Sequence, residues 1–128
     1  MKRLILGLAL AGLAVVSAAC SSGGGGAPAP GGSATVTAGG NVTIVAKDNK
    51  FLTTSITAPA DAAFGIELDN QDAAPHNIAV SDASGASVFK GEIVTATKVA
   101  NAIPALAAGS YPFICEVHPD MKGTITAE

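Results

Sequence analysis

One short stretch near the C-terminus, residues 111–123, concentrates the residue types that bind soft metals. It places Cys115, His118 and Met121 at C-x2-H-x2-M spacing. A thiolate, neutral imidazoles and a weak thioether form the donor set that favours copper cycling between Cu(I) and Cu(II). The chain has only one other histidine, His76, which would complete a trigonal His2Cys set. The sequence therefore predicts one copper ion, with His76, Cys115 and His118 in the plane and Met121 on the axis.

Each of these residues also has an ordinary structural interpretation. A lone cysteine is usually a small buried hydrophobe, and a lone methionine usually fills a core. A lone histidine more often lies in a core or on the surface than on a metal. The joint spacing in residues 111–123 favours the metal over these alternatives. Zinc on Cys115 and the two histidines is chemically possible as well.

Residues 111–123, together with Pro75, His76 and Asn77, resemble the small type 1 (blue) copper proteins, the cupredoxin family. Within that plastocyanin- and amicyanin-like group, the short C-x2-H-x2-M loop is most similar to the loop of amicyanin. The resemblance covers about residues 35–128. It implies a one-electron carrier whose partners are redox proteins, such as cytochrome c or a membrane electron-transfer complex.

The resemblance also implies roles for individual residues. Electrons would pass through the edge of His118, and an apolar rim would dock the partner, made more acidic by Asp72 and Asp120. In the family, the residue equivalent to Asn77 hydrogen-bonds toward the residue after the cysteine, usually Ser or Thr. Here that residue is Glu116, so an altered contact is expected. The predicted apolar rim consists of Ala73, Ala74, Pro75, Pro119 and Met121.

The N-terminus has the layout of an export signal. Basic residues at 2–3 precede an apolar run over 4–16, which is too short for a membrane-spanning helix, and then small residues over 17–19. Cys20 follows directly, as at a bacterial lipoprotein cleavage site, although Ser17 stands where that pattern prefers an aliphatic residue. Cleavage after Ala18 or Ala19, or an uncleaved anchor, are the alternatives.

These features predict three parts in the chain. Residues 1–19 form a signal peptide, 20–33 form a lipidated Cys20 with a flexible Gly/Ser/Pro tether, and 34–128 form the copper-binding domain. The expected location is extracytoplasmic, either in the periplasm or anchored to the cell membrane by a lipid. If Cys20 is lipidated, Cys115 is a lone thiol in an oxidising compartment, which also favours a bound metal.

Beyond residue 34 the pattern is one of short strands. Residues 63–69 alternate apolar and polar, as a half-buried strand does. An Ala-rich segment at 102–108 contains Pro104 and is expected to be a loop after Ile103. Seven or eight short strands with frequent turns predict an all-β, Greek-key β-sandwich. Expected strands cover 35–38, 42–46, 55–58, 63–69, 76–80, 111–115 and 123–127, and residues 88–89 and 98–100 are expected to be strand pieces around a less regular region.

Charge and composition narrow the function classes. The full chain has a net charge of −3, and only five lysines oppose ten acidic residues after residue 19, with no basic patch for nucleic acid. Four protein ligands leave no open metal position for a substrate, and no catalytic constellation appears elsewhere, so an enzyme is not expected. Electron transfer is the first prediction. Copper binding or trafficking on the same scaffold is the alternative.

Overall fold

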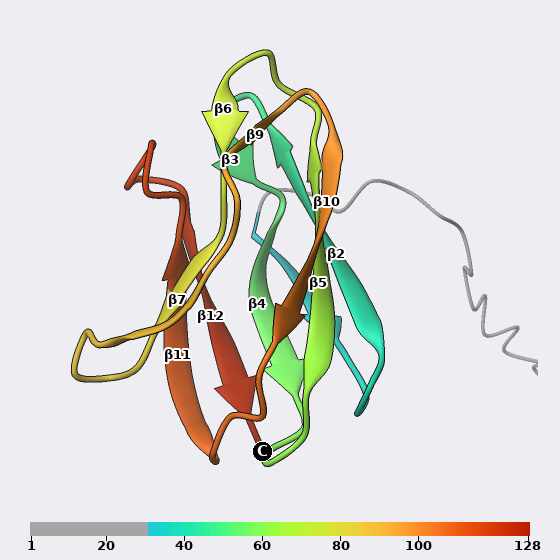
Figure 1. The fold of residues 1–128 in the computed structure, drawn as a ribbon, viewed down its shortest axis with the longest axis vertical. Coiled ribbons are helices and arrows are strands. Elements are labelled where there is room, and N and C mark those ends of the chain that lie inside the picture. The colour runs from blue at the N-terminus through green and yellow to red at the C-terminus, as the bar shows by residue number, and fades with distance from the viewer. Residues whose placement is uncertain (1–30) are drawn as a thin grey trace, which may run out of the picture.

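The computed structural model describes residues 31–128, so the predicted signal peptide and most of the predicted tether lie outside the described residues. Within these residues the chain is built from strands, turns and loops, without a helix. Accordingly, the described part contains no helix long and apolar enough to cross a membrane. The fold is an all-β sandwich, as the sequence predicted (Figure 1).

The larger sheet has six strands in the order β1-β4-β12-β11-β7-β8. Its central strands β11 and β12 are antiparallel, whereas β4 runs parallel to both β1 and β12. The strands are β1 (Gly32–Thr35), β4 (Thr53–Ala58), β7 (Ala79–Ser81), β8 (Ser87–Lys90), β11 (Gly109–Ile114) and β12 (Lys122–Ala127).

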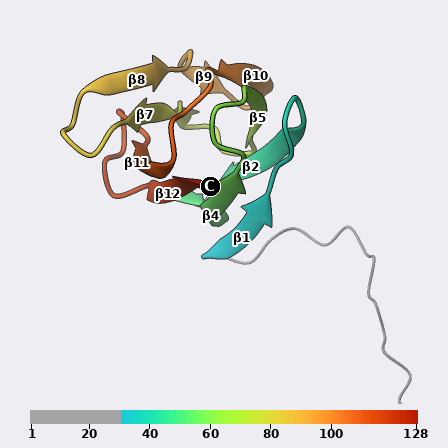
Figure 2. The ribbon, with the colours of Figure 1, turned by 90° about the horizontal axis from the view of Figure 1, so that it is seen from below.

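The smaller sheet has four strands in the order β10-β5-β2-β3, and it faces the first across the interior (Figure 2). A separate ribbon of two short strands, β6 (Pro75–His76) and β9 (Val94–Thr95), pairs His76 with Val94. The strands of the smaller sheet are β2 (Asn41–Lys47), β3 (Lys50–Phe51), β5 (Phe64–Asn70) and β10 (Lys98–Ile103).

The core lies between the two sheets and is filled by side chains that alternate along the strands. In β5, Phe64, Ile66 and Leu68 are buried, as their alternation predicted. They pack in one cluster with residues of the opposite sheet, including Phe113 and Ile125. Burial of this apolar surface is the main driving force for such a sandwich. Cys115 and Met121 belong to the same cluster, so the core extends to the predicted ligands.

The strand count is larger than predicted for a simple reason. Of the twelve strands within residues 31–128, four have only two or three residues, namely β3, β6, β7 and β9. The strand expected over 76–80 is divided into β6 and β7, because Asn77 and Ile78 leave the sheet between them. Residues 104–107 form a loop, as Pro104 indicated.

The first strand covers Gly32–Thr35, so it begins and ends three residues earlier than the expected 35–38. Gly32 and Ser33 were assigned to the predicted tether, yet they are strand residues, and the amide of Gly32 donates to the carbonyl of Leu52 at 2.9 Å. An edge strand is held by its main-chain hydrogen bonds, which need no large side chain. A Gly/Ser composition therefore did not reveal it.

Candidate metal centre

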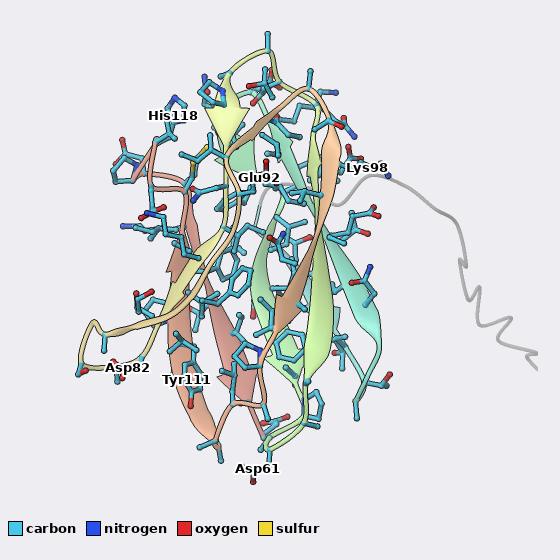
Figure 3. All side chains as sticks on the ribbon, in the orientation of Figure 1. Asp61, Asp82, Glu92, Lys98, Tyr111 and His118 are labelled. Carbon is cyan, nitrogen blue, oxygen red and sulfur yellow. The ribbon has the colours of Figure 1, made fainter. Side chains whose placement is uncertain are left out.

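The pairing of β7 with β11 brings the segments that carry His76 and Cys115 together. His76 ends β6 and Cys115 follows β11, and β7 pairs with β11 through Val80 with Phe113 and Ala79 with Ile114. His76 and Cys115, far apart in sequence, therefore emerge at the same end of the sandwich. The loop after β11 supplies His118, which lies at the end of the molecule opposite Asp61 (Figure 3).

Three donor atoms form a tight cluster. The Sγ of Cys115 lies 3.6 Å from Nδ1 of His76 and 4.0 Å from Nδ1 of His118. All three donor atoms lie within 4.8 Å of one another. His76 and Cys115 are fully buried, whereas His118 is half-buried. The two imidazole rings are tilted, with centroids 4.8 Å apart.

The loop that carries these donors is closed by its own backbone. The amide of Cys115 donates to the carbonyl of Met121, and the amide of Met121 donates to the carbonyl of His118, both at 2.9 Å. Met121 is buried in the core cluster next to the start of β12. These two hydrogen bonds hold the backbone of the loop that carries Cys115, His118 and Met121.

The distances fit a single small metal ion. Metal–sulfur and metal–nitrogen bonds of about 2.3 and about 2.0 Å, separated by about 120°, put the sulfur and each nitrogen about 3.7 Å apart. The observed 3.6 and 4.0 Å lie on either side of that value. The donors also have the softness that copper favours, with Met121 as the adjacent thioether.

A carboxylate sets the orientation of the buried histidine. Asp72 Oδ2 lies 3.0 Å from Nε2 of His76. Its two carboxylate oxygens also accept hydrogen bonds from the amides of Asp48 and Asn49, at 2.8 and 3.0 Å. With Asp72 as acceptor, Nε2 of His76 carries the proton and Nδ1 offers its lone pair to the metal.

The ionisation of Asp72 is consistent with this role. Burial alone raises the pKa of Asp72, but hydrogen bonds from Asn49, Asp48 and His76 hold it below its ordinary value of 3.8. The group is therefore a carboxylate at neutral pH and accepts, but does not donate, hydrogen bonds.

Comparison with known proteins identifies the family. A family model described as a cupredoxin-like domain matches residues 8–127 of this chain. The chain belongs to the cupredoxin family. This result and the donor set agree, because the clustered donor atoms of His76, Cys115 and His118 in this cupredoxin fit one copper ion.

Individual relatives support the assignment. Amicyanin from Paracoccus versutus is 35% identical over 80 residues, which make up 62% of this chain and 58% of that protein. The matched part is thus less than two thirds of the relative's length. A crystal structure of Paracoccus versutus amicyanin has a TM-score of 0.55 at 31% identity and covers 68% of this cupredoxin and 80% of the solved chain. A structure of an amicyanin variant in its Cu(I) form has the same TM-score at 21% identity, covering 68% and 81%, and shows the fold alone.

The two ligand segments of this cupredoxin are joined beside the donors. The amide of Glu116 donates to Oδ1 of Asn77 at 2.9 Å, and Nδ2 of Asn77 donates to Oε2 of Glu116 at 2.8 Å. The contact between the residue after His76 and the residue after Cys115 is therefore present. It is altered as expected, because a carboxylate takes the place of the hydroxyl.

Two residues shape the histidine loop in a way that the sequence did not predict: Asn70 was not singled out, and Asp72 was expected only as an acidic group of the rim. Asn70, at the end of β5, is buried and donates to the carbonyls of Ala74 and Val94 at 2.9 and 2.8 Å. Its Oδ1 accepts the amide of Asp72 at 2.9 Å. Asn70 and Asp72 both precede His76 in a predicted loop, and polar residues so near a ligand were the available signal.

The apolar rim differs in part from the prediction. Met121 is buried and adds no surface to it, so that part of the prediction is wrong. The side chain of Asp72 is only 15% exposed, because its carboxylate faces His76, so it is not a free acidic group of the rim. Ala73, Pro75 and Pro119 are exposed as predicted. Among the large hydrophobic side chains of the described residues, two are exposed, Ile93 at 51% and Val117 at 39%.

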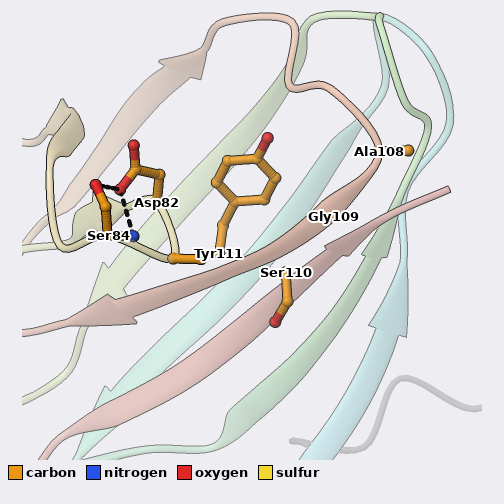
Figure 4. A pocket seen from close by; sticks show the side chains of 7 residues that line it. Asp82, Ser84, Ala108, Gly109, Ser110 and Tyr111 are labelled. Carbon is orange, nitrogen blue, oxygen red and sulfur yellow. Dashed lines mark hydrogen bonds between the residues drawn. The ribbon is translucent and has the colours of Figure 1, made fainter.

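A surface hollow away from the donors has a different character. It is lined by the turn after β7 and the start of β11, with Asp82, Ser84 and Tyr111 among its residues (Figure 4). Asp82 Oδ1 accepts bonds from the amide and hydroxyl of Ser84, so its polar groups serve the turn. The hydroxyl of Tyr111 donates to the carbonyl of Ala107 at 2.9 Å. The polar side chains of this hollow therefore stabilise the local turns.

Proposed function

We propose that this protein is a one-electron carrier with a type 1 copper site formed by His76, Cys115, His118 and Met121. The observation that carries the proposal is the cluster in which Cys115 Sγ faces Nδ1 of both histidines at 3.6 and 4.0 Å. Bound copper would supply the Cu(I)/Cu(II) couple. Electron transfer needs no open coordination position, in agreement with four protein ligands and a buried site.

The chain's own residues would keep the site nearly unchanged between oxidation states. Asp72 orients His76, the backbone bonds of the loop hold Cys115 and Met121, and Asn77 joins the two segments. Supporting hydrogen bonds of this kind fix ligand orientation. A carrier benefits because little has to move when the charge of the ion changes. The buried thiol is also shielded from oxidants in solvent.

The surface near His118 is the proposed electron exit. His118 is half-buried, whereas His76 is fully enclosed, so a partner can approach only the former closely. The neighbouring Val117 and Pro119 are exposed and provide an apolar contact. We assign the docking of redox partner proteins, such as a cytochrome c or a membrane electron-transfer complex, to this surface.

The proposed location is outside the cytoplasm. This part of the proposal comes from the signal-like N-terminus and Cys20, which lie outside the described residues. A lipid on Cys20 would tether the copper domain to a membrane. Cell fractionation of the natural chain and of Cys20→Ser tests it. The anchor predicts a shift of the protein from the membrane fraction to the soluble fraction, and an unchanged distribution would refute it.

Mixing experiments with a c-type cytochrome test the carrier function. The copper-loaded, reduced protein is expected to reduce oxidised cytochrome c in a second-order reaction followed by absorbance. Val117→Ser should slow this reaction without altering the spectrum of the copper site, because it changes only the contact surface. Cys115→Ser should abolish it. Spectra of an intact site with no transfer to any of several cytochromes would leave a copper-binding protein and would contradict the carrier proposal.

A further inference from the structure

Three segments meet at the carboxylate of Glu116, the residue that follows Cys115. Lys90, the last residue of β8, places Nζ 3.0 Å from Oε1 of Glu116. Asn77 donates to the other carboxylate oxygen at 2.8 Å. One side chain therefore connects the segments that carry His76 and Cys115 to the end of β8.

The other side of Asn77 is equally well defined. Asn77 is fully buried, and its Nδ2 also donates to the carbonyl of Gly91 at 3.2 Å. Gly91 in turn donates to the carbonyl of Ile78 at 2.8 Å. A Cβ at Gly91 would come within 2.6 Å of Oδ1 of Asn101, so the close approach of this backbone requires glycine. The carboxylate of Glu116 is thus seated in a built network.

The ion pair itself is partly exposed. The side chain of Glu116 is 34% exposed and that of Lys90 is 64% exposed. Lys90 and Asn77 each bind one carboxylate oxygen of Glu116, so the chain holds a carboxylate and an ammonium group together beside the segment that carries Cys115. An exposed ion pair adds little to the free energy of unfolding, so the electrostatic effect of these two charges on the metal centre is the property to consider.

We propose that Glu116 and Lys90 are positioning residues with opposite electrostatic effects, which together set the balance between Cu(II) and Cu(I) at the adjacent centre. The inference rests on the proposed copper function. The oxidised ion carries one more positive charge than the reduced ion. A carboxylate nearby therefore favours the oxidised state and lowers the reduction potential, and a lysine ammonium raises it.

Charge-removing variants test this directly. Glu116→Gln keeps an oxygen that can accept from Asn77 but removes the charge, so it should raise the potential. Lys90→Met should lower it. Each change corresponds to about a three- to tenfold change in the ratio of Cu(II) to Cu(I) affinity, given partial exposure of the pair. The double variant should lie between the single ones, and its shift should shrink in high salt because salt screens exposed charges.

Lys98→Met and Glu67→Gln are matched controls. Lys98 Nζ lies 3.2 Å from Oε1 of Glu67, so these variants remove the same charges from a pair on another strand pair, β10 and β5. They should leave the potential unchanged. Chelator titrations measure the affinities for Cu(I) and Cu(II) in each variant. Melting of the metal-free single and double variants of Glu116 and Lys90 measures how strongly the two charges interact.

The outcomes separate the two proposals. If the unsubstituted protein gives no type 1 spectrum, the proposed function fails. If the spectrum is normal but Glu116→Gln and Lys90→Met shift the potential no more than the controls, or both shift it in the same direction, the inference about this pair is overturned. Opposite shifts that weaken with salt support it.

Discussion

Asp72 and His76 form a carboxylate–imidazole pair in which Oδ2 and Nε2 are 3.0 Å apart, while Nδ1 of the same ring faces Cys115. The imidazole is thereby fixed from both sides. Two amides of the turn between β2 and β3, those of Asp48 and Asn49, hold the carboxylate in turn. A surface turn is thus connected to the candidate metal centre through one side chain.

Removing the Asp72 carboxylate should weaken metal binding. In Asp72→Ala, the ring of His76 loses the acceptor that fixes its tautomer, and copper affinity should fall about 10- to 100-fold, as for other residues that hold metal ligands. Competition titration with a copper chelator measures this. Asp82→Ala is the control, because it also removes a carboxylate that binds turn amides but leaves His76 untouched. Equal affinities in the two variants would show that Asp72 does not orient the ligand.

Close packing of β11 on β12 gives a second prediction. Gly123 pairs with Phe113, and a Cβ at Gly123 would collide with the ring of Phe113 and come within 2.6 Å of the carbonyl oxygen of Thr54. Because backbone cannot yield as a flexible side chain can, Gly123→Ala should lower the free energy of unfolding by about 1–3 kcal/mol. Urea unfolding of the metal-free protein measures this change. Ser110→Ala, at an exposed position of β11, is the control. An unchanged urea midpoint would contradict the close packing around Gly123.

The turn at Asp82 predicts a dependence of stability on pH. Hydrogen bonds from the hydroxyl of Ser84 and the amide of Ala86 hold the pKa of Asp82 below its ordinary value of 3.8. Since the folded state has the lower pKa, the unfolded chain takes up the proton first as the pH falls. The stabilisation is complete above pH 3.8 and is lost as the pH falls through the folded-state pKa.

Urea midpoints of the natural chain and Asp82→Asn, measured across pH, test this prediction. The natural chain should be more stable at pH 7, and the two curves should converge below pH 3.8. A difference that stays constant down to pH 2 would argue against an ionised Asp82 as the cause. The turn lies in the hollow of Figure 4, where Asp82 and Ser84 face each other.

The sequence predicted that His76, Cys115 and His118 come together, but not the contacts that support them. Cys115, His118 and Met121 share a short loop, so their spacing was sufficient, and His76 was the only remaining histidine. The strand alternation of β5 likewise predicted the sandwich. Lys90 contacts Glu116 only because β8 reaches the loop after β11 through the folded sheet, and no local pattern reveals that. Short strands such as β6 and β9 depend on main-chain pairing, which amino-acid composition does not reveal.

The sequence also did not predict which acidic side chains near the site are exposed to solvent. Asp72 and Asp120 are the same residue type near the same site, yet Asp72 is turned inward onto His76 and Asp120 is exposed. The difference arises from the amides of Asp48 and Asn49, in the turn between β2 and β3, which bind the carboxylate of Asp72. Only the tertiary arrangement distinguishes a structural carboxylate from a solvated one.

The visible spectrum of the purified protein with one equivalent of Cu(II), recorded before and after ascorbate, tests the central claim most directly. The proposed ligands predict an intense blue or green band from the bond between Cys115 sulfur and copper, which ascorbate bleaches and reoxidation restores. Cys115→Ser should remove the band, and Met121→Leu should shift it. A pale complex, or no binding at one equivalent, would contradict a type 1 copper site at these four residues.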